Sequence, residues 1–181
     1  MKTINVPTRD QVSPSNQALF DSLSKALGMV PNLYAVMAHS ENALAKYLAF
    51  QSAKTSLSNK EKEAVNLVVS EVNGCLYCQS AHTVLGKMNG FSENEILDLR
   101  SGISGNSKLN TLVGLAKDIT LNKGRVNAIT VDKFFAAGYT EESLIDLMMQ
   151  ISDKIAMNYL HNLTSIQIDF PIAEKLTAVR A

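Results

Sequence analysis

Three side chains capable of redox and acid–base chemistry stand close together in the pattern Cys75-x-x-Cys78-x-x-x-His82. On an α-helix with about 3.6 residues per turn, all three fall within an arc of roughly 60° and share one face. Two sulfurs three residues apart near a helix start can close a disulfide, and a helix N-terminus favours the thiolate. The pattern therefore favours a redox site. The helix start points to Cys75 as the reactive thiol, whereas the one-turn spacing to the histidine points to Cys78.

A carboxylate upstream, Glu63, is the fourth candidate for this site. It lies in the first turns of a helix that Ser58 and Glu61 begin with a capping-box pattern. If this helix and the cysteine helix form a hairpin across Gly74, Glu63 returns to the face that holds the histidine. There it could orient the imidazole or pass protons. Glu71 is the competing carboxylate, and its place near the hairpin end predicts a solvated side chain.

Other sites built from the same residues fit the pattern less well. A structural zinc site needs four ligands, and the motif has no second pair at ligand spacing, since His39 and His161 stand alone. Covalent haem attachment requires a histidine directly after the second cysteine, where Gln79 stands. A thioredoxin-type site would follow a strand, whereas this motif lies among helices. The remaining alternative is structural, with two buried cysteines and a core histidine.

Apolar residues recur at three- and four-residue steps almost throughout the chain, and Ser, Thr, Asn or Asp stand before most of these segments. The sequence therefore predicts an all-α fold in one domain over residues 1–181, with a helical hairpin holding the cysteine motif. The expected helices cover 15–27, a short segment from 32, 41–54, 59–72, 75–90, 93–99, 109–121, 131–137 and 141 to about 168, followed by a short tail after Pro171.

Two junctions of the chain echo each other without a gap, Gly90–Leu99 and Gly138–Leu147. Both end a helix at glycine, place an aromatic residue next, cap with a hydroxyl and begin an amphipathic helix. One interpretation is an internal duplication in which only the first half has the cysteines. The other is that any junction of this kind converges on the same pattern.

Composition limits the classes of partner. The chain has 17 Lys and Arg against 17 Asp and Glu, so no basic excess is available for nucleic acid or an anionic membrane surface. No apolar run approaches the roughly 20 residues of a membrane-spanning helix, and no secretory signal is evident. We expect a cytoplasmic protein, in which a close cysteine pair is redox-active or binds metal rather than forming a permanent disulfide.

The sequence resembles the AhpD-like alkylhydroperoxidase family of the carboxymuconolactone decarboxylase superfamily. Its glutamate, two cysteines and histidine occur here at the family spacing, and the likeness extends over nearly the whole chain to the longer peroxidase-related members. The matching segments are Leu57-Ser58-x-Lys60-Glu61-x-Glu63, Cys75-x-x-Cys78-x-x-x-His82, Gly90-Phe91-Ser92, Val30-Pro31-Asn32 and 134–169.

The resemblance implies an AhpD-like multihelical fold, assembly as a trimer or hexamer, and a thiol peroxidase mechanism without metal or flavin. By this analogy Cys78 is the peroxidatic thiolate, served by a His82 and Glu63 proton relay, and Cys75 is the resolving thiol. An external dithiol or lipoyl-type protein would restore both thiols. Some family members have a histidine between the cysteines, where this chain has Tyr77, a poor proton shuttle at neutral pH.

Two rival functions stay open at this point. The first is a decarboxylase or lactone-processing enzyme like the other branch of the superfamily, which does not depend on the cysteine pair. The second is a redox-sensing oligomer in which oxidation changes assembly without turnover. The expected substrate of the leading function is a small-molecule hydroperoxide.

Overall fold

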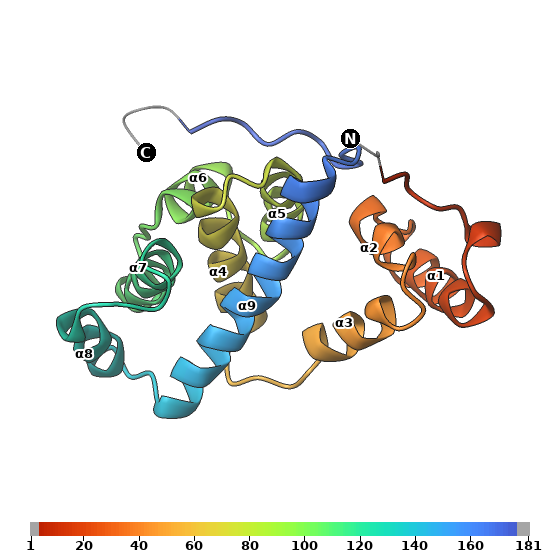
Figure 1. Cartoon of the computed structure of the whole chain (residues 1–181). Helices are drawn as coiled ribbons and strands as arrows, with labels where there is room; N and C mark the ends of the chain where they lie inside the picture. Colours follow the sequence, from red (N-terminus) through yellow and green to blue (C-terminus); the bar gives the residue numbers. More distant parts are fainter. Residues whose placement is uncertain (1–3, 177–181) are drawn as a thin grey trace. The chain divides into compact units, whose positions relative to one another are not determined.

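Capping residues and apolar periodicity produce the helices of this chain. The structure, a computed structural model, describes residues 4–176. Every regular element in that range is helical, which confirms the all-α fold class. The elements are the 3-10 helix η1 (Arg9–Gln11) and the α-helices α1 (Pro14–Leu27), α2 (Asn32–Met37), α3 (Ala43–Gln51), α4 (Asn59–Val72), α5 (Leu76–Met88), α6 (Glu93–Ser101), α7 (Ser107–Leu121), α8 (Ala128–Ala136) and α9 (Glu141–Thr164) (Figure 1).

The described chain divides into two compact units. The first contains helices α1 to α3 and the segment Leu160–Asp169, and the second contains Thr55–Tyr159 and residues 170–176. The sequence-based expectation of one domain over 1–181 stays a prediction. No helix among residues 4–176 combines the length and the apolar character that crossing a bilayer requires.

The first unit has a small apolar core of its own. Phe20 and Leu23, one turn apart on α1, pack with Leu44 of α3, which is fully buried. The Asp169 carboxylate accepts a hydrogen bond from the backbone N–H of Asn32 at 2.7 Å and so ties the segment after α9 to the start of α2.

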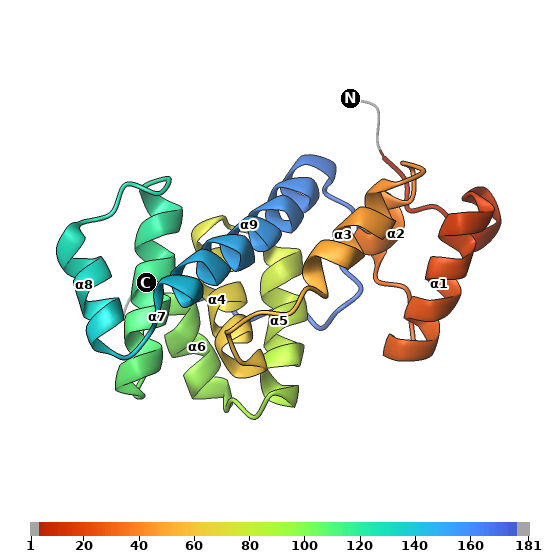
Figure 2. The ribbon, with the colours of Figure 1, turned by 90° about the horizontal axis from the view of Figure 1, so that it is seen from below.

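In the second unit, α4 is the central helix, and its residues 64–70 are all buried. Its fully buried side chains include Val65, Leu67 and Val68, and α4 packs against α5, α6 and α7. Each such burial contributes roughly 1.5–3 kcal/mol. Helix α9 runs beside α4 in both ribbon views (Figures 1 and 2), and hydrogen bonds join the two helices. Residues of α4, α5 and α9 are thereby brought together.

Most predicted helix boundaries agree with the structure, but three of them are wrong by three residues or more. The helix expected over 41–54 ends at Gln51, and Ser52 is its C-cap. The last helix ends at Thr164 rather than near 168, since Ser165 adopts a left-handed φ of 49° and its N–H bonds the His161 carbonyl at 2.7 Å. Helix α8 begins at Ala128, earlier than expected, because the Asn127 side chain caps the backbone N–H of Ile129 at 2.9 Å.

The echoed junctions adopt the same local structure. Gly90 and Gly138 have φ of 84° and 88°, a left-handed conformation that glycine adopts without strain. The hydroxyls of Ser92 and Thr140 each accept a hydrogen bond from the backbone N–H three residues later. The helices that follow differ, with 9 residues in α6 and 24 in α9. Internal duplication therefore stays a prediction.

The Ser58 capping box holds the start of the helix on which Glu63 lies. The Ser58 hydroxyl accepts from the N–H of Glu61 at 3.3 Å, and the Glu61 carboxylate accepts from the N–H of Ser58 at 2.8 Å. We expect Ser58→Ala to lower the free energy of unfolding by about 1 kcal/mol, measured by urea denaturation. Ser107→Ala, which changes an exposed serine outside a cap position, is the matched control. An equal effect of the two variants would contradict this role of the cap.

Candidate functional site

The hairpin of α4 and α5 closes through a short turn in which Gly74 has φ of 60°. The N–H of Cys75 bonds the Ser70 carbonyl at 3.0 Å, which ends α4 and directs the chain into α5. A side chain at Gly74 would meet open space, so its left-handed backbone is what this turn requires. The predicted hairpin across Gly74 is therefore present.

Both cysteines lie at the start of α5 as free thiols. Cys75 is the N-cap residue, and its Sγ accepts a hydrogen bond from the backbone N–H of Cys78 at 3.3 Å. Cys75 is 0% exposed and Cys78 is 3% exposed. A sulfur that accepts a hydrogen bond from a first-turn backbone N–H of a helix is placed to hold negative charge.

The Glu63 and His82 side chains meet on the inner side of the hairpin. His82 Nδ1 lies 2.7 Å from Glu63 Oε2, and both side chains are largely buried. Since a carboxylate only accepts hydrogen bonds, Nδ1 is the donor, and this leaves Nε2 as the nitrogen that can take or give a proton. The Asn66 amide donates to the other carboxylate oxygen of Glu63 at 3.2 Å. The pair is thus a positioned acid–base group.

The environment keeps Glu63 ionised. Burial raises the pKa of its carboxyl, but the charge and the hydrogen bond of His82 lower it, with further lowering from the Lys154 charge and from Asn66. The net result is a pKa below the ordinary glutamate value of 4.5. A buried carboxylate of this kind stabilises a protonated imidazole when His82 takes up a proton.

This lowered pKa predicts a pH-dependent stability. The ionised Glu63 contributes stability that is complete above the unfolded-state value of about 4.5 and is lost as the pH falls through the lower folded-state value. Glu63→Gln should therefore be less stable than the wild type at about pH 6. Its free energy of unfolding should fall less than that of the wild type when the pH is lowered to about 3. Guanidinium unfolding at both pH values measures the difference. Glu142→Gln, at an exposed position of α9, is the control. An unchanged pH dependence in Glu63→Gln would contradict this role of the carboxylate.

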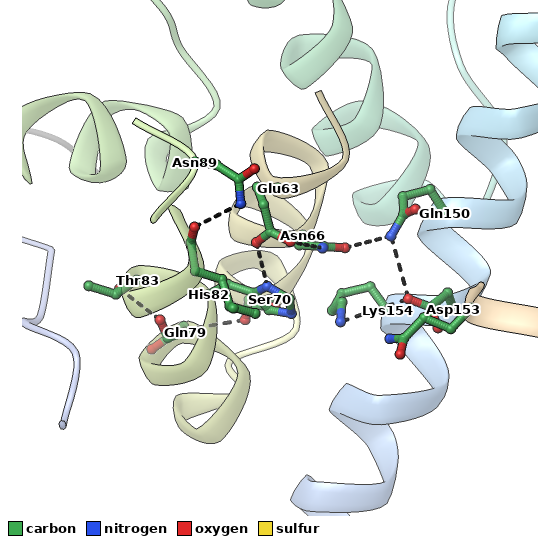
Figure 3. A network of polar contacts seen from close by, with 12 residues as sticks. Glu63, Asn66, Ser70, Gln79, His82, Thr83, Asn89, Gln150, Asp153 and Lys154 are labelled. Carbon is green, nitrogen blue, oxygen red and sulfur yellow. Dashed lines mark hydrogen bonds and ion pairs between the residues drawn. The ribbon is translucent and has the colours of Figure 1, made fainter. Parts of the chain in front are cut away.

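Polar side chains of α9 extend the site, and sequence reasoning missed them. The Gln150 amide donates to Asn66 Oδ1 at 2.7 Å and lies 3.4 Å from Asp153 Oδ2 (Figure 3). Lys154 Nζ lies 3.8 Å from the same Asp153 oxygen, and both residues of this pair are buried. One turn later Asn158, fully buried, donates to the Ser70 hydroxyl at 3.3 Å. The spacing of these polar positions, three or four residues apart on one helix, is the only signal that the sequence offers.

Opposing effects act on Cys78. The hydrogen bond with Cys75 and burial raise the pKa of the Cys78 thiol far above its ordinary value. The positive charge of Lys154 and a hydrogen bond from Asn158 lower it. Two adjacent sulfurs therefore share one negative charge at most, and the groups on α9 oppose the cost of placing it on Cys78.

Tyr77, between the cysteines, serves packing. Its ring is 3% exposed and meets Phe170 edge-on, with centroids 5.6 Å apart. The segment after Phe170 continues over α5, where the N–H of Ala173 bonds the Ser80 hydroxyl at 3.0 Å. This segment therefore covers the outer face of the cysteine helix.

Glu71, expected to be solvated, is instead paired. Its carboxylate bonds the buried Arg100 guanidinium at 2.7–2.8 Å, and Arg100 also donates to the Glu174 carbonyl at 2.6 Å. The two isolated histidines bond backbone carbonyls, His39 that of Asn5 and His161 that of Ile166. Across residues 4–176, no three His, Cys, Asp or Glu side chains form a cluster suited to a metal ion.

Comparison with known proteins gives one matching family model and several solved structures with the same fold. A search of curated proteins finds no match. The model of the carboxymuconolactone decarboxylase family matches residues 35–118, which include the whole cysteine hairpin.

Three solved structures have the same fold. The alkylhydroperoxidase AhpD core of an uncharacterized peroxidase-related protein from Ralstonia eutropha JMP134 is 17% identical with a TM-score of 0.83, covering 93% of this chain and 94% of that one. An uncharacterized peroxidase-related protein from Silicibacter sp. TM1040 is 19% identical with a TM-score of 0.80, covering 92% of each chain. The debrominase Bmp8, in complex with 2,3,4-tribromopyrrole, is 16% identical with a TM-score of 0.77, covering 93% and 92%. The family model thus matches just under half of this chain, and the three structures show that the chain has an AhpD-like fold.

Proposed function

We propose that this protein is a thiol-dependent peroxidase that reduces hydroperoxides with the Cys75 and Cys78 pair. The observation that supports this most strongly is the placement of two reduced cysteines at one helix start, in the hairpin that also holds a buried, hydrogen-bonded pair of Glu63 and His82. A thiol, a second thiol three residues away and a positioned acid–base group are what such a reaction requires.

The proposed reaction has three steps. First, Cys78 gives its proton to His82, and the thiolate attacks the peroxide; an S–O bond forms, the O–O bond breaks, and the departing alkoxide takes the proton from His82. Second, the Cys75 thiol attacks the sulfenic acid of Cys78, forming the disulfide and releasing water. Third, an external dithiol reduces the disulfide and is itself oxidised to a disulfide. The net reaction converts a hydroperoxide and a dithiol into an alcohol, water and an oxidised dithiol.

The proposal names no cofactor beyond this dithiol. A small dithiol or a lipoyl-type protein is the expected donor, and a reducing compartment such as the cytoplasm would keep the pair ready to react. Assembly of the chain as a trimer or hexamer belongs to the same proposal, and light scattering of the reduced and oxidised protein tests it. A size change on oxidation without turnover would favour the redox-sensing alternative.

A donor-coupled assay tests the proposed function. Purified protein with dihydrolipoamide and an organic hydroperoxide should oxidise one donor per peroxide consumed, and a Cys75→Ser, Cys78→Ser double variant should show only the background rate. Peroxide reduction by the double variant at the wild-type rate would overturn the proposal. The same assay with 2,3,4-tribromopyrrole in place of peroxide examines the reaction suggested by the debrominase neighbour. Bromide release faster than peroxide consumption would favour dehalogenation over peroxide reduction.

A further inference from the structure

Lys154 is a cation in an unusual place. Its side chain is 3% exposed, although lysine is almost never fully buried without a close partner. Within residues 4–176 its one ion-pair contact is Asp153 at 3.8 Å, longer than a hydrogen bond. Asp153 Oδ1 is buried without a hydrogen-bond partner in that range, and Oδ2 has only a weak contact with Gln150 at 3.4 Å. The pair with Asp153 therefore does not account for the burial of this charge.

Helix α9 directs Lys154 toward the cysteine hairpin. Gln150, one turn before it, bonds α4 through Asn66, and Asn158, one turn after it, bonds Ser70 near the end of α4. The side-chain oxygen Oδ1 of Asn158 also accepts a hydrogen bond from the Asn73 side-chain amide at 2.9 Å, in the turn that leads into α5. Lys154 lies between these two anchors, and its side chain extends toward α4 and α5 (Figure 3).

We propose that Lys154 is a positioning residue that stabilises the thiolate of Cys78 through its positive charge, an inference that rests on the proposed function and assigns a new residue to it. The position of the charges in the buried site, rather than their sum, supports the inference, because Glu63 and Asp153 together carry as much negative charge as protonated His82 and Lys154 carry positive charge. Glu63 is balanced by His82 once the histidine holds the thiol proton, so a second cation is needed for the negative charge left on sulfur. Lys154 supplies that cation, and the long contact with Asp153 leaves it available.

Charged and titratable groups of the described chain reach the site of Cys78 from three elements. From α5 and its cap they are Cys75 and His82, from α4 Glu63, and from α9 Asp153 and Lys154. The Lys154 charge lowers the pKa of both Cys78 and Glu63, in agreement with a side chain that extends from α9 toward α4 and α5. Asp153 opposes it, because a carboxylate next to the cation reduces the positive potential at the sulfur. Removing the cation and removing the carboxylate should therefore have opposite effects.

The test measures the thiolate directly in a Cys75→Ser background. This substitution leaves Cys78 as the single cysteine and keeps a hydroxyl at the N-cap. The ultraviolet absorbance of the thiolate is followed against pH, with a protein lacking both cysteines as the blank. We expect Lys154→Met to raise the titration midpoint by at least about one pH unit, and Asp153→Asn to lower it. Lys133→Met, an exposed lysine of α8, should leave it unchanged.

Two results would overturn the inference. One is an unchanged midpoint in folded Lys154→Met protein, as a purely structural lysine predicts. The other is an unchanged or raised midpoint in Asp153→Asn, which decides the question if Lys154→Met fails to fold. Since the titration needs no peroxide, the two proposals fail separately. Opposite midpoint shifts without peroxide reduction would uphold Lys154 and reject the peroxidase. Peroxide reduction with unchanged titration midpoints would support the peroxidase and reject the role of Lys154.

Discussion

Replacing Cys78 by serine is expected to lower kcat/KM for hydroperoxide reduction by at least about three orders of magnitude, the scale on which removal of an enzyme nucleophile acts. A serine hydroxyl is not ionised near neutral pH, and it cannot form the sulfenic acid or the disulfide on which turnover depends. The substitution replaces the side-chain sulfur by oxygen and leaves the start of α5 in place. Donor-coupled turnover and single-turnover kinetics measure the loss.

The Cys75→Ser variant is the matched control for that experiment. It keeps Cys78, so one rapid oxidation by peroxide should remain, while turnover stops because no resolving thiol is present. A sulfenic acid trapped on Cys78 in this variant would be the expected product. The opposite pattern, with rapid oxidation in Cys78→Ser and none in Cys75→Ser, would assign the peroxidatic role to Cys75, whose sulfur accepts the N–H at the helix start.

His82→Asn is expected to have the second largest effect. Loss of a positioned acid–base group lowers rates by about 10²–10⁴-fold. The same change removes the histidine that donates a hydrogen bond to the buried Glu63 carboxylate, and leaving a buried charged group without its partner costs about 1–3 kcal/mol of stability or more. Peroxide turnover and guanidinium unfolding, measured on the same preparations, separate the two losses.

Two further variants make this prediction specific. His39→Asn changes a histidine that bonds a backbone carbonyl, and it should leave turnover unaltered. Glu63→Gln combined with His82→Asn should be less destabilised than the sum of the single variants, since the double variant has no unpaired buried charge. Additive losses of stability would show that the 2.7 Å contact between Glu63 and His82 is not an energetic unit.

The sequence predicts the local part of the site well because that part depends on helical spacing. The capping box at Ser58 and the interruption at Gly74 mark the two ends of α4. A hairpin of α4 with the following helix is then enough to bring Glu63 to His82. Their contact is present at 2.7 Å. What each residue does in a reaction stays a prediction, since spacing places side chains but does not test their chemistry.

The α9 half of the site could not be predicted from the sequence. Gln150 and Asn66 are 84 positions apart, and only the packing of α9 on α4 brings them together. A lysine on an amphipathic helix is ordinarily assigned to the solvated face, as Lys154 would be. Glu71 is a second example. Its sequence position does not indicate that it pairs with Arg100, which is buried and also bonds the Glu174 carbonyl. The three- and four-residue spacing of the polar positions on α9 does not reveal which residues of α4 they contact.

The most direct measurement of the central claim is a thiol count after a single oxidation. Reduced protein, with its two cysteines, is mixed with one equivalent of an organic hydroperoxide, and free thiols, alcohol product and peptide masses are determined. The account predicts the loss of two thiols per alcohol formed, with Cys75 and Cys78 joined in one disulfide and both thiols restored by dihydrolipoamide. Folded protein that keeps both thiols in excess peroxide, or that consumes peroxide with both thiols intact, would contradict it.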